Sequence, residues 1–248
     1  MSLGTESILV RAAHRGRHLV KTAVDERARR RLRREAKWLR ELESVSELDG
    51  QVPRVVDEGT DAEGRPYLVV SAVPGAEGKA FTTNHVRFLA TLGKARFRAT
   101  DFEVSSCCRV LRRQLHAGLE QAYHDCETAL LYWTGPYVLS HGAFTPQNVR
   151  DLGSQVFVTE WGDARIEANP IDDVLHYLMS GGGTAAGLKA AMKRAGDFAA
   201  ATWPEWSWRP QVIGALTLAY LLGVVARVSP DSATSWKLIE NRSAWMPA

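Results

Sequence analysis

A lysine and a glutamate near the start of the sequence have the types and spacing to form a buried ion pair. Glu35 lies within an apolar stripe that recurs every three or four residues, formed by Ala28, Leu32, Leu39 and Leu42, so these residues share one face of a helix. A carboxylate on that face needs a partner, because an unpaired buried charge is very costly. The preceding strand, HLVKTA, offers Lys21. The alternative is a partly exposed Glu35 beside solvated arginines.

Two further segments place polar groups just after short apolar strands. They are HGAFTPQNV, residues 141–149, and VFVTEWGDA, residues 156–164. Binding and catalytic residues are often found in loops that are fixed at strand ends. If the two strands pair, Asn148 and Glu160 could both reach one cation. Each segment alone is a weak signal, because a His-Gly turn and a Glu before a Trp often occur by chance.

Taken together in this order, the segments resemble the aminoglycoside phosphotransferase and choline kinase branch of the protein-kinase-like fold. The family's strand lysine and helix glutamate are matched by Lys21 and Glu35. Its catalytic loop, H-G-D-x-x-x-x-N, is matched by HGAFTPQN, and its metal loop, Asp-Trp, by Glu160-Trp161. Its downstream pattern, P-x-x-D-x-x-H-x-L, is matched by PIDDVLHYL, with Asp173 as the structural aspartate. The resemblance covers about residues 7–180.

The resemblance implies an α+β, two-lobed protein-kinase-like fold that transfers a phosphoryl group from ATP to a hydroxyl. In this family Lys21 would contact the α- and β-phosphates while Glu35 holds Lys21. Asn148 and Glu160 would hold Mg²⁺, and His141 would be a structural histidine of the catalytic loop rather than an acid. The expected acceptor is a hydroxylated small molecule or a sugar. The sequence offers no clear carboxylate cluster that would bind an aminoglycoside.

Three departures from the family pattern predict a degraded active site. The loop aspartate that accepts the proton of the attacking hydroxyl is replaced by Ala143, which cannot do so. The metal-loop aspartate is replaced by Glu160, whose extra methylene matters to an ion that demands near-ideal octahedral geometry. Only about six residues precede SILVRAA, so we expect no glycine-rich phosphate loop. We therefore expect weak or absent phosphotransfer; the alternative is an inactive pseudokinase that acts as a binding or regulatory module.

The elements that must position these residues form a small β-rich lobe and a larger helical lobe. Strand-like runs at 7–13, 18–23, 53–60 and 65–73, with a helix from Asp25 to about Leu42, predict an N-terminal lobe over residues 1–74. Helical spacing over 82–98 and 107–132, two short strands, and helices from near Asp172 predict a C-terminal lobe over residues 75–248 that carries both loops.

Composition excludes several classes of protein. A hydrophobic fraction of 45% with 24% charged residues excludes wholesale disorder. Three cysteines cannot form a disulfide scaffold, and the start of the sequence does not read as a secretory signal, so we expect a cytoplasmic location. The 17 uncharged residues between Arg209 and Arg227 include Pro210 and are at the short limit for a membrane span. We expect a buried core helix there and no membrane contact.

The charge is uneven along the chain. Residues 1–50 hold 12 Lys+Arg and 8 Asp+Glu, whereas the remainder holds 19 and 20. The excess gathers at Arg27–Arg34, and we expect a solvated helix face that could meet an acidic protein partner. Binding of nucleic acid is disfavoured, because no aromatic residues are interleaved with the arginines. Trp203, Trp206 and Trp208 are expected to pack in the core and anchor a loop rather than to stack on a sugar.

Overall fold

The chain folds into two compact units. The computed structural model describes residues 10–15, 18–73, 75–78, 80–181, 183–227 and 233–247, with only the backbone at 10–15 and 227. One unit, here the sheet unit, takes in Thr5–Thr91 together with His141–Ala164. The other, here the helical unit, takes in Leu92–Ser140 and Arg165–Ala248. The expected absence of a glycine-rich loop falls on residues before Val10, which lie outside the described residues.

The boundaries of the two units differ from those of the two predicted lobes. The sequence placed residues 75–91 and both loops with the C-terminal lobe, but these residues belong to the same unit as the N-terminal sheet. Direct bonds within the unit explain the difference. Val158 N donates to Gln51 O at 2.8 Å, and Lys21 bonds to Glu160. The predicted site residues of both loops therefore fall in one compact unit with Lys21 and Glu35.

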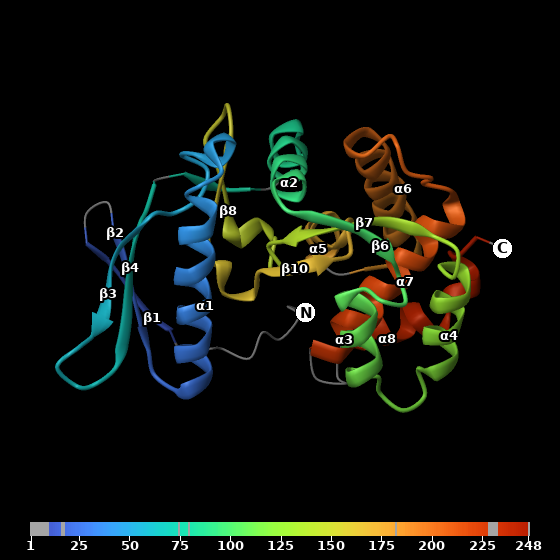
Figure 1. The fold of residues 1–248 in the computed structure, drawn as a ribbon, viewed down its shortest axis with the longest axis horizontal. Helices are drawn as coiled ribbons and strands as arrows, with labels where there is room; N and C mark the ends of the chain where they lie inside the picture. The colour runs from blue at the N-terminus through green and yellow to red at the C-terminus, as the bar shows by residue number, and fades with distance from the viewer. Residues whose placement is uncertain are drawn as a thin grey trace. The chain divides into compact units, whose positions relative to one another are not determined.

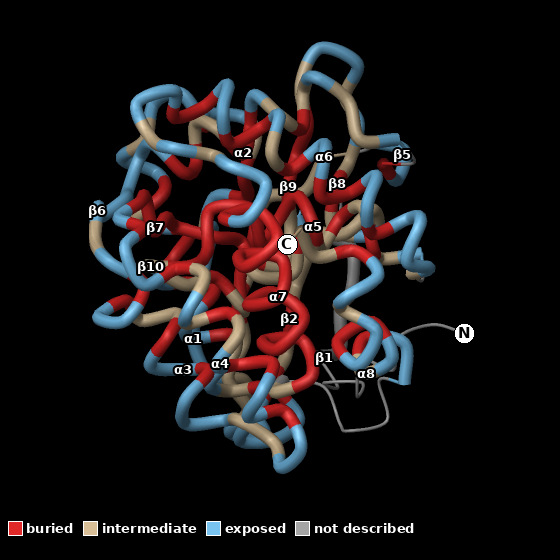
Figure 2. Tube along the Cα trace, turned by 90° about the vertical axis from the view of Figure 1, so that its right-hand side faces the viewer, coloured by how far each residue is buried: buried red, intermediate tan, exposed pale blue. Residues whose placement is uncertain are grey.

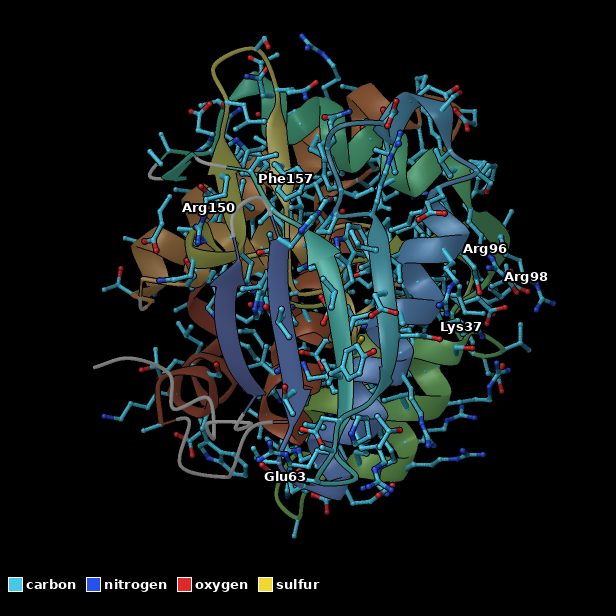
Figure 3. The ribbon with its side chains drawn as sticks, turned by 90° about the vertical axis from the view of Figure 1, so that its left-hand side faces the viewer. Lys37, Glu63, Arg96, Arg98, Arg150 and Phe157 are labelled. Carbon is cyan, nitrogen blue, oxygen red and sulfur yellow. The ribbon has the colours of Figure 1, made fainter. Side chains whose placement is uncertain are left out.

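A four-stranded antiparallel sheet, in the order β1-β2-β4-β3, forms the base of the sheet unit. Its inner face carries the buried Lys21, Ala23, Leu68 and Val70, and helix α1 lies along the sheet (Figure 1). Figure 3 looks onto this sheet, with Glu63 at the tip of the β3–β4 hairpin. The bounds are β1 Val10–Arg15, β2 His18–Ala23, α1 Glu26–Leu42, η1 Ser46–Leu48, β3 Val55–Thr60 and β4 Pro66–Ser71.

A second, smaller sheet of the same unit has the order β5-β8-β9 and carries the two loops. Its strands β8 and β9 pair with Arg150 opposite Phe157, both labelled in Figure 3. The loop that matches the family's catalytic loop, residues 141–148 and here called the catalytic-type loop, leads into β8. The loop that matches its metal loop, residues 159–164 and here called the metal-type loop, follows β9. The bounds are β5 Ala76–Glu77, α2 Thr83–Ala95, η2 Pro146–Asn148, β8 Val149–Asp151, β9 Val156–Val158 and η3 Trp161–Asp163.

Helix α1 forms as its sequence predicts. The side chain of Asp25 accepts a hydrogen bond from Ala28 N at 2.6 Å, so Asp25 is the N-cap of the helix. The predicted apolar stripe is buried, and Glu35 within it is only 2% exposed. The alternative of a partly exposed Glu35 is wrong, because α1 packs its whole inner face on the sheet and on η3.

The helical unit contains a three-stranded sheet, β10-β7-β6, among helices. Helix α7 coincides with the long uncharged segment and is buried over most of its length (Figure 2), which confirms the predicted core helix. In the part of the chain that the structure describes, no helix has the length and apolar character to span a bilayer. The bounds are β6 Phe97–Asp101, α3 Ser106–Gln114, α4 Glu120–Ala129, β7 Thr134–Ser140, β10 Arg165–Ala168, α5 Asp172–Met179, α6 Ala185–Thr202, α7 Pro210–Arg227, α8 Ala233–Glu240 and η4 Arg242–Ala244.

Two predicted helices end earlier than their apolar spacing indicated. The helix predicted over 82–98 stops at Ala95, because the next residues pair with a distant strand, with Arg98 opposite Tyr137. The helix predicted over 107–132 is broken between α3 and α4 at Gly118, whose φ of 89° a right-handed helix cannot contain. Both differences arise from tertiary pairing or a local turn that outweighs periodicity.

The tryptophan cluster packs as predicted. Trp203 is 2% exposed, and its ring centroid lies 5.8 Å from that of Phe198 and 6.3 Å from that of Trp208. Trp208 Nε1 donates to Trp203 O at 2.8 Å, which closes the loop after α6. These tryptophans anchor the loop to the core of the helical unit.

Candidate functional site

Lys21 and Glu35 form the buried ion pair that the sequence predicts. Lys21 Nζ lies 2.7 Å from Glu35 Oε1, and each side chain is 2% exposed. Strand β2 turns Lys21 inward by alternation, and α1 turns Glu35 toward it by helical spacing. Burial disfavours the charged ammonium, but two neighbouring carboxylates outweigh it and raise the pKa of Lys21. The lysine therefore stays charged, and Glu35 depends on it as its cation.

Glu160 of the metal-type loop also bonds to Lys21. Its Oε1 accepts a hydrogen bond from Lys21 Nζ at 2.5 Å. Glu160 has a φ of 66° and a ψ of 57°, a left-handed conformation that non-glycine residues rarely adopt. The backbone at this position and the length of the glutamate side chain together bring the carboxylate to the lysine. The resemblance implies that Glu160 holds Mg²⁺; in this structure its carboxylate lies on Lys21.

Arg31 extends the same set of contacts. Its guanidinium NH2 lies 2.9 Å from Asp163 Oδ2 and 3.9 Å from Glu160 Oε2. The prediction that Arg31 belongs to a solvated face is wrong: its side chain is only 18% exposed, because α1 packs against η3. A signal was present in the sequence, since Arg31 stands four residues before Glu35 and so shares its side of the helix.

These contacts join five side chains into one row of alternating charge, here called the ion chain: Glu35, Lys21, Glu160, Arg31 and Asp163. The row runs from the buried pair to the surface, where Asp163 is 40% exposed. Each cation lies between two carboxylates. Neither cation is left to act as a free positive charge, and neither carboxylate of the metal-type loop is left without a cation.

The pKa of Glu160 gives the ion chain a testable pH dependence. Burial alone would raise this pKa, but Lys21 and then Arg31 outweigh it and hold the pKa below the ordinary value of a glutamate. The ionised carboxylate of Glu160 therefore stabilises the fold above the pKa of an unfolded glutamate, about 4.3. This contribution is lost as the pH falls through the lower pKa that Glu160 has in the folded protein.

We expect wild type to exceed Glu160→Gln by about 1 kcal/mol in free energy of unfolding at neutral pH, allowing for solvent screening. The difference should shrink as the pH is lowered, because a protonated Glu160 resembles glutamine. Urea denaturation of both proteins between about pH 7 and about pH 3 measures it. A difference that stays constant over this range would contradict the charged contact.

The catalytic-type loop is held by its own polar residues. His141 Nε2 lies 2.8 Å from Thr159 O, and His141 Nδ1 accepts from Ala143 N at 3.3 Å. One neutral tautomer satisfies both contacts, so His141 binds the two loops together. Asn148 Nδ2 donates to Ala143 O at 2.8 Å, and Thr159 N donates to Asn148 O at 2.9 Å. The loop therefore fixes the backbone of Ala143, whose side chain supplies no proton acceptor.

Aromatic rings pack against one another beneath the backbone of both loops, within the core of the sheet unit. Trp161 is fully buried, and its ring centroid lies 4.7 Å from that of His141 in an edge-on contact. Phe144 stacks on Phe88 of α2 with centroids 5.9 Å apart. Phe88 also contacts Trp161, at 6.3 Å. These ring contacts pack both loops against the apolar core of the sheet unit.

Comparison with known proteins gives matches in structure but not in sequence. No protein-family model matches the sequence, and no curated protein matches it. The GDP complex of wild-type aminoglycoside 2'-phosphotransferase-IIIa is 18% identical, with a TM-score of 0.57 over 98% of this chain and 91% of that chain. A putative fructosamine-3-kinase from Haemophilus somnus 129PT is 14% identical, with a TM-score of 0.59 over 91% and 83%.

A choline/ethanolamine kinase family protein from Mesorhizobium loti is 16% identical, with a TM-score of 0.56 over 100% of this chain and 88% of that chain. The chain has the protein-kinase-like fold of these small-molecule kinases. The predicted α+β fold class is confirmed. The ion chain includes Lys21, Glu35 and Glu160, three of the residues on which the resemblance rests, and the catalytic-type loop supplies another of the matched motifs.

The metal-type loop of this kinase-like fold fits a magnesium ion poorly. The resemblance places Mg²⁺ on Asn148 and Glu160, but Glu160 already lies on Lys21 and beside Arg31. A divalent ion bound there would be brought close to two cations. Among the described residues, no group of three or more His, Cys, Asp or Glu side chains is placed to hold a metal ion.

Proposed function

We propose that the protein is a homologue of the small-molecule kinases in which ATP-dependent phosphoryl transfer to a hydroxyl is weak or absent. The observation that carries the proposal is Ala143, held in place at the loop position where the resemblance puts the proton-accepting aspartate. A positioned general base contributes about 10²–10⁴-fold to such a reaction. The proposed acceptor class is a hydroxylated small molecule, in line with the names of the structural neighbours. The proposed location is the cytoplasm.

The ion chain supports weak binding of a nucleotide rather than efficient turnover. An ammonium group has three donors, and Lys21 uses two of them on Glu35 and Glu160. Contacts among the described residues therefore leave one donor for a phosphate oxygen of ATP. The five groups of the ion chain carry two positive and three negative charges, so their net charge opposes the approach of a triphosphate and weakens its binding.

Thermal melting with ATP tests this proposal. Millimolar ATP should raise the melting temperature of the wild type by about 1–4 °C, because a ligand that binds only the folded state stabilises it by mass action. The shift should be of similar size with Mg²⁺ and with a chelator. No shift at millimolar nucleotide would sink the nucleotide-binding part of the proposal and leave a pseudokinase that serves as a scaffold.

The second candidate function is a pseudokinase that binds an acidic protein through the outer face of α1. Helix α1 holds eight Lys+Arg and three Asp+Glu, and one of these acids, Glu35, is buried. Arg27, Arg30, Arg33 and Arg34 are exposed, and Lys37 follows them on the outer side of the helix (Figure 3). Cations in the first turns oppose the helix dipole, so helix stability does not explain them.

The size of this surface favours an acidic peptide over nucleic acid. From Arg27 to Arg34 the helix rises about 10 Å. Farther along, Lys37 and Arg40 lie near Glu41 and Glu58, which neutralise that end. The only aromatic residue of α1, Trp38, is buried, so no ring is presented for base stacking. A short acidic segment fits a cationic surface of this length.

A binding assay separates the two partners. A fluorescent polyglutamate peptide should bind the wild type at low salt, and the variant with Arg30, Arg33 and Arg34 changed to Ala should bind it at least about tenfold more weakly. A matched variant with the exposed Lys94, Lys189 and Lys237 changed to Ala should keep wild-type affinity. Equal loss in both variants, or tighter binding of a single-stranded oligonucleotide, would contradict an acidic-peptide site.

A further inference from the structure

The guanidinium of Arg31 lies between the two carboxylates of the metal-type loop. Arg31 NH2 is 2.9 Å from Asp163 Oδ2 and 3.9 Å from Glu160 Oε2, so one nitrogen faces both acids. The arginine side chain is 18% exposed and belongs to α1, while both acids belong to the loop after β9. The guanidinium of Arg31, from α1, thus lies within ion-pair distance of two carboxylates of the loop.

The loop is shaped to receive this arginine. A Cβ placed on Gly162 would lie 2.3 Å from Arg31 Cγ and 2.8 Å from Arg31 Nε, so the aliphatic stem of the arginine crosses the backbone where no side chain stands. Trp161 N, just before this glycine, points to Glu35 Oε1 at 3.4 Å. Helix α1 therefore meets the loop through Glu35 and Arg31, one turn apart, and the position of the guanidinium is set by the helix.

We infer that Arg31 is a built-in cation that takes the place of a divalent metal between Glu160 and Asp163. Carboxylate oxygens are the ligands that Mg²⁺ and Mn²⁺ prefer. An arginine cannot lose its proton in a protein, so its charge is permanent. A metal ion must displace the guanidinium to reach both acids, and Lys21 repels it from the other side. The inference rests on the proposed function and deepens it, because it concerns Glu160, the acid that the resemblance places on Mg²⁺.

The variant Arg31→Met tests the inference, because it should gain the ability to bind a divalent metal ion. Methionine keeps an unbranched stem over Gly162 but removes the positive charge between Glu160 and Asp163. In the protein without nucleotide, about 10 mM Mn²⁺ or Mg²⁺ should raise the melting temperature of Arg31→Met by about 2–4 °C. The wild type should not shift. Loss of the free Mn²⁺ signal in electron paramagnetic resonance measures the same binding directly.

Arg40→Met is the matched control, because Arg40 is an exposed arginine of the same helix that lies outside the ion chain. It should behave as the wild type does toward both ions. The double variant Arg31→Met, Asp163→Asn should lose most of the gained Mn²⁺ binding, since one of the two acids is gone. If Arg31→Met does not fold, Arg31→Gln serves in its place, because glutamine is also neutral and of similar reach.

Two results would overturn the inference. One is wild-type binding of Mn²⁺ as tight as that of the folded Arg31 variant; the other is a folded variant that gains no Mn²⁺ binding. Neither result depends on nucleotide or on phosphoryl transfer. A failure of the inference can therefore be told apart from a failure of the proposed function, which the ATP melting experiment tests.

Discussion

Replacing Lys21 by methionine is expected to lower the free energy of unfolding by about 3–5 kcal/mol, because it leaves the buried carboxylate of Glu35 without its cation. Both side chains of the pair are 2% exposed, so water cannot take the place of the lysine. Burial raises the pKa of Glu35 against the opposing effect of Lys21, so removing the lysine disfavours the charged carboxylate further. The melting temperature should fall by about 6–20 °C.

Two variants make this expectation specific to the pair. Lys37→Met removes a lysine of α1 that is 70% exposed, and it should change stability by less than about 0.5 kcal/mol. The double variant Lys21→Met, Glu35→Leu should recover most of the loss, because a buried ion pair can be replaced by apolar side chains of similar volume at little cost. A loss in Lys21→Met no larger than that in Lys37→Met would contradict a buried pair.

Restoring a carboxylate in the catalytic-type loop is expected to have the largest effect on activity. Ala143→Asp should raise ATP hydrolysis or transfer to a hydroxyl by up to about 10²–10⁴-fold over the wild type, the usual contribution of a positioned base. The loop that would hold the new carboxylate is already fixed by His141 and Asn148. A coupled assay for ADP release measures the change.

Ala143→Asn is the control for this gain. Asparagine has the shape of aspartate but cannot accept a proton at neutral pH, so its activity should stay at the wild-type level. Equal rates in the two variants would show that a base at residue 143 is not the limiting loss. In that case the contact of Glu160 with Lys21 would be the defect to reverse, by Glu160→Asp.

The buried pair of Lys21 and Glu35 could be predicted from the sequence, because a single rule, that a buried charge needs a partner, was enough. Glu35 falls within an apolar helical stripe, a buried acid needs a cation, and the inward-facing lysine of the preceding strand is Lys21. The long core helix α7 followed equally from the absence of charge between Arg209 and Arg227. In both cases, burial and local periodicity favour the same structure.

The rest of the site could not be predicted in this way. The contact of Glu160 with Lys21 depends on a left-handed backbone conformation at Glu160, which the neighbouring residue types do not predict. Arg31 was grouped with its neighbouring arginines as surface, and its inward role depends on α1 packing against a glycine of a loop more than a hundred residues away. Strand β6 likewise exists through its pairing with β7. Such contacts are decided by tertiary structure.

Weak or absent phosphoryl transfer is tested by the rate at which the wild type transfers the labelled γ-phosphate of ATP to hydroxyl compounds, measured beside Lys21→Met. We expect the wild-type rate to lie far below the roughly 1–100 s⁻¹ of active kinases, with or without Mg²⁺. A wild-type rate within that range, dependent on Mg²⁺ and abolished in Lys21→Met, would contradict it.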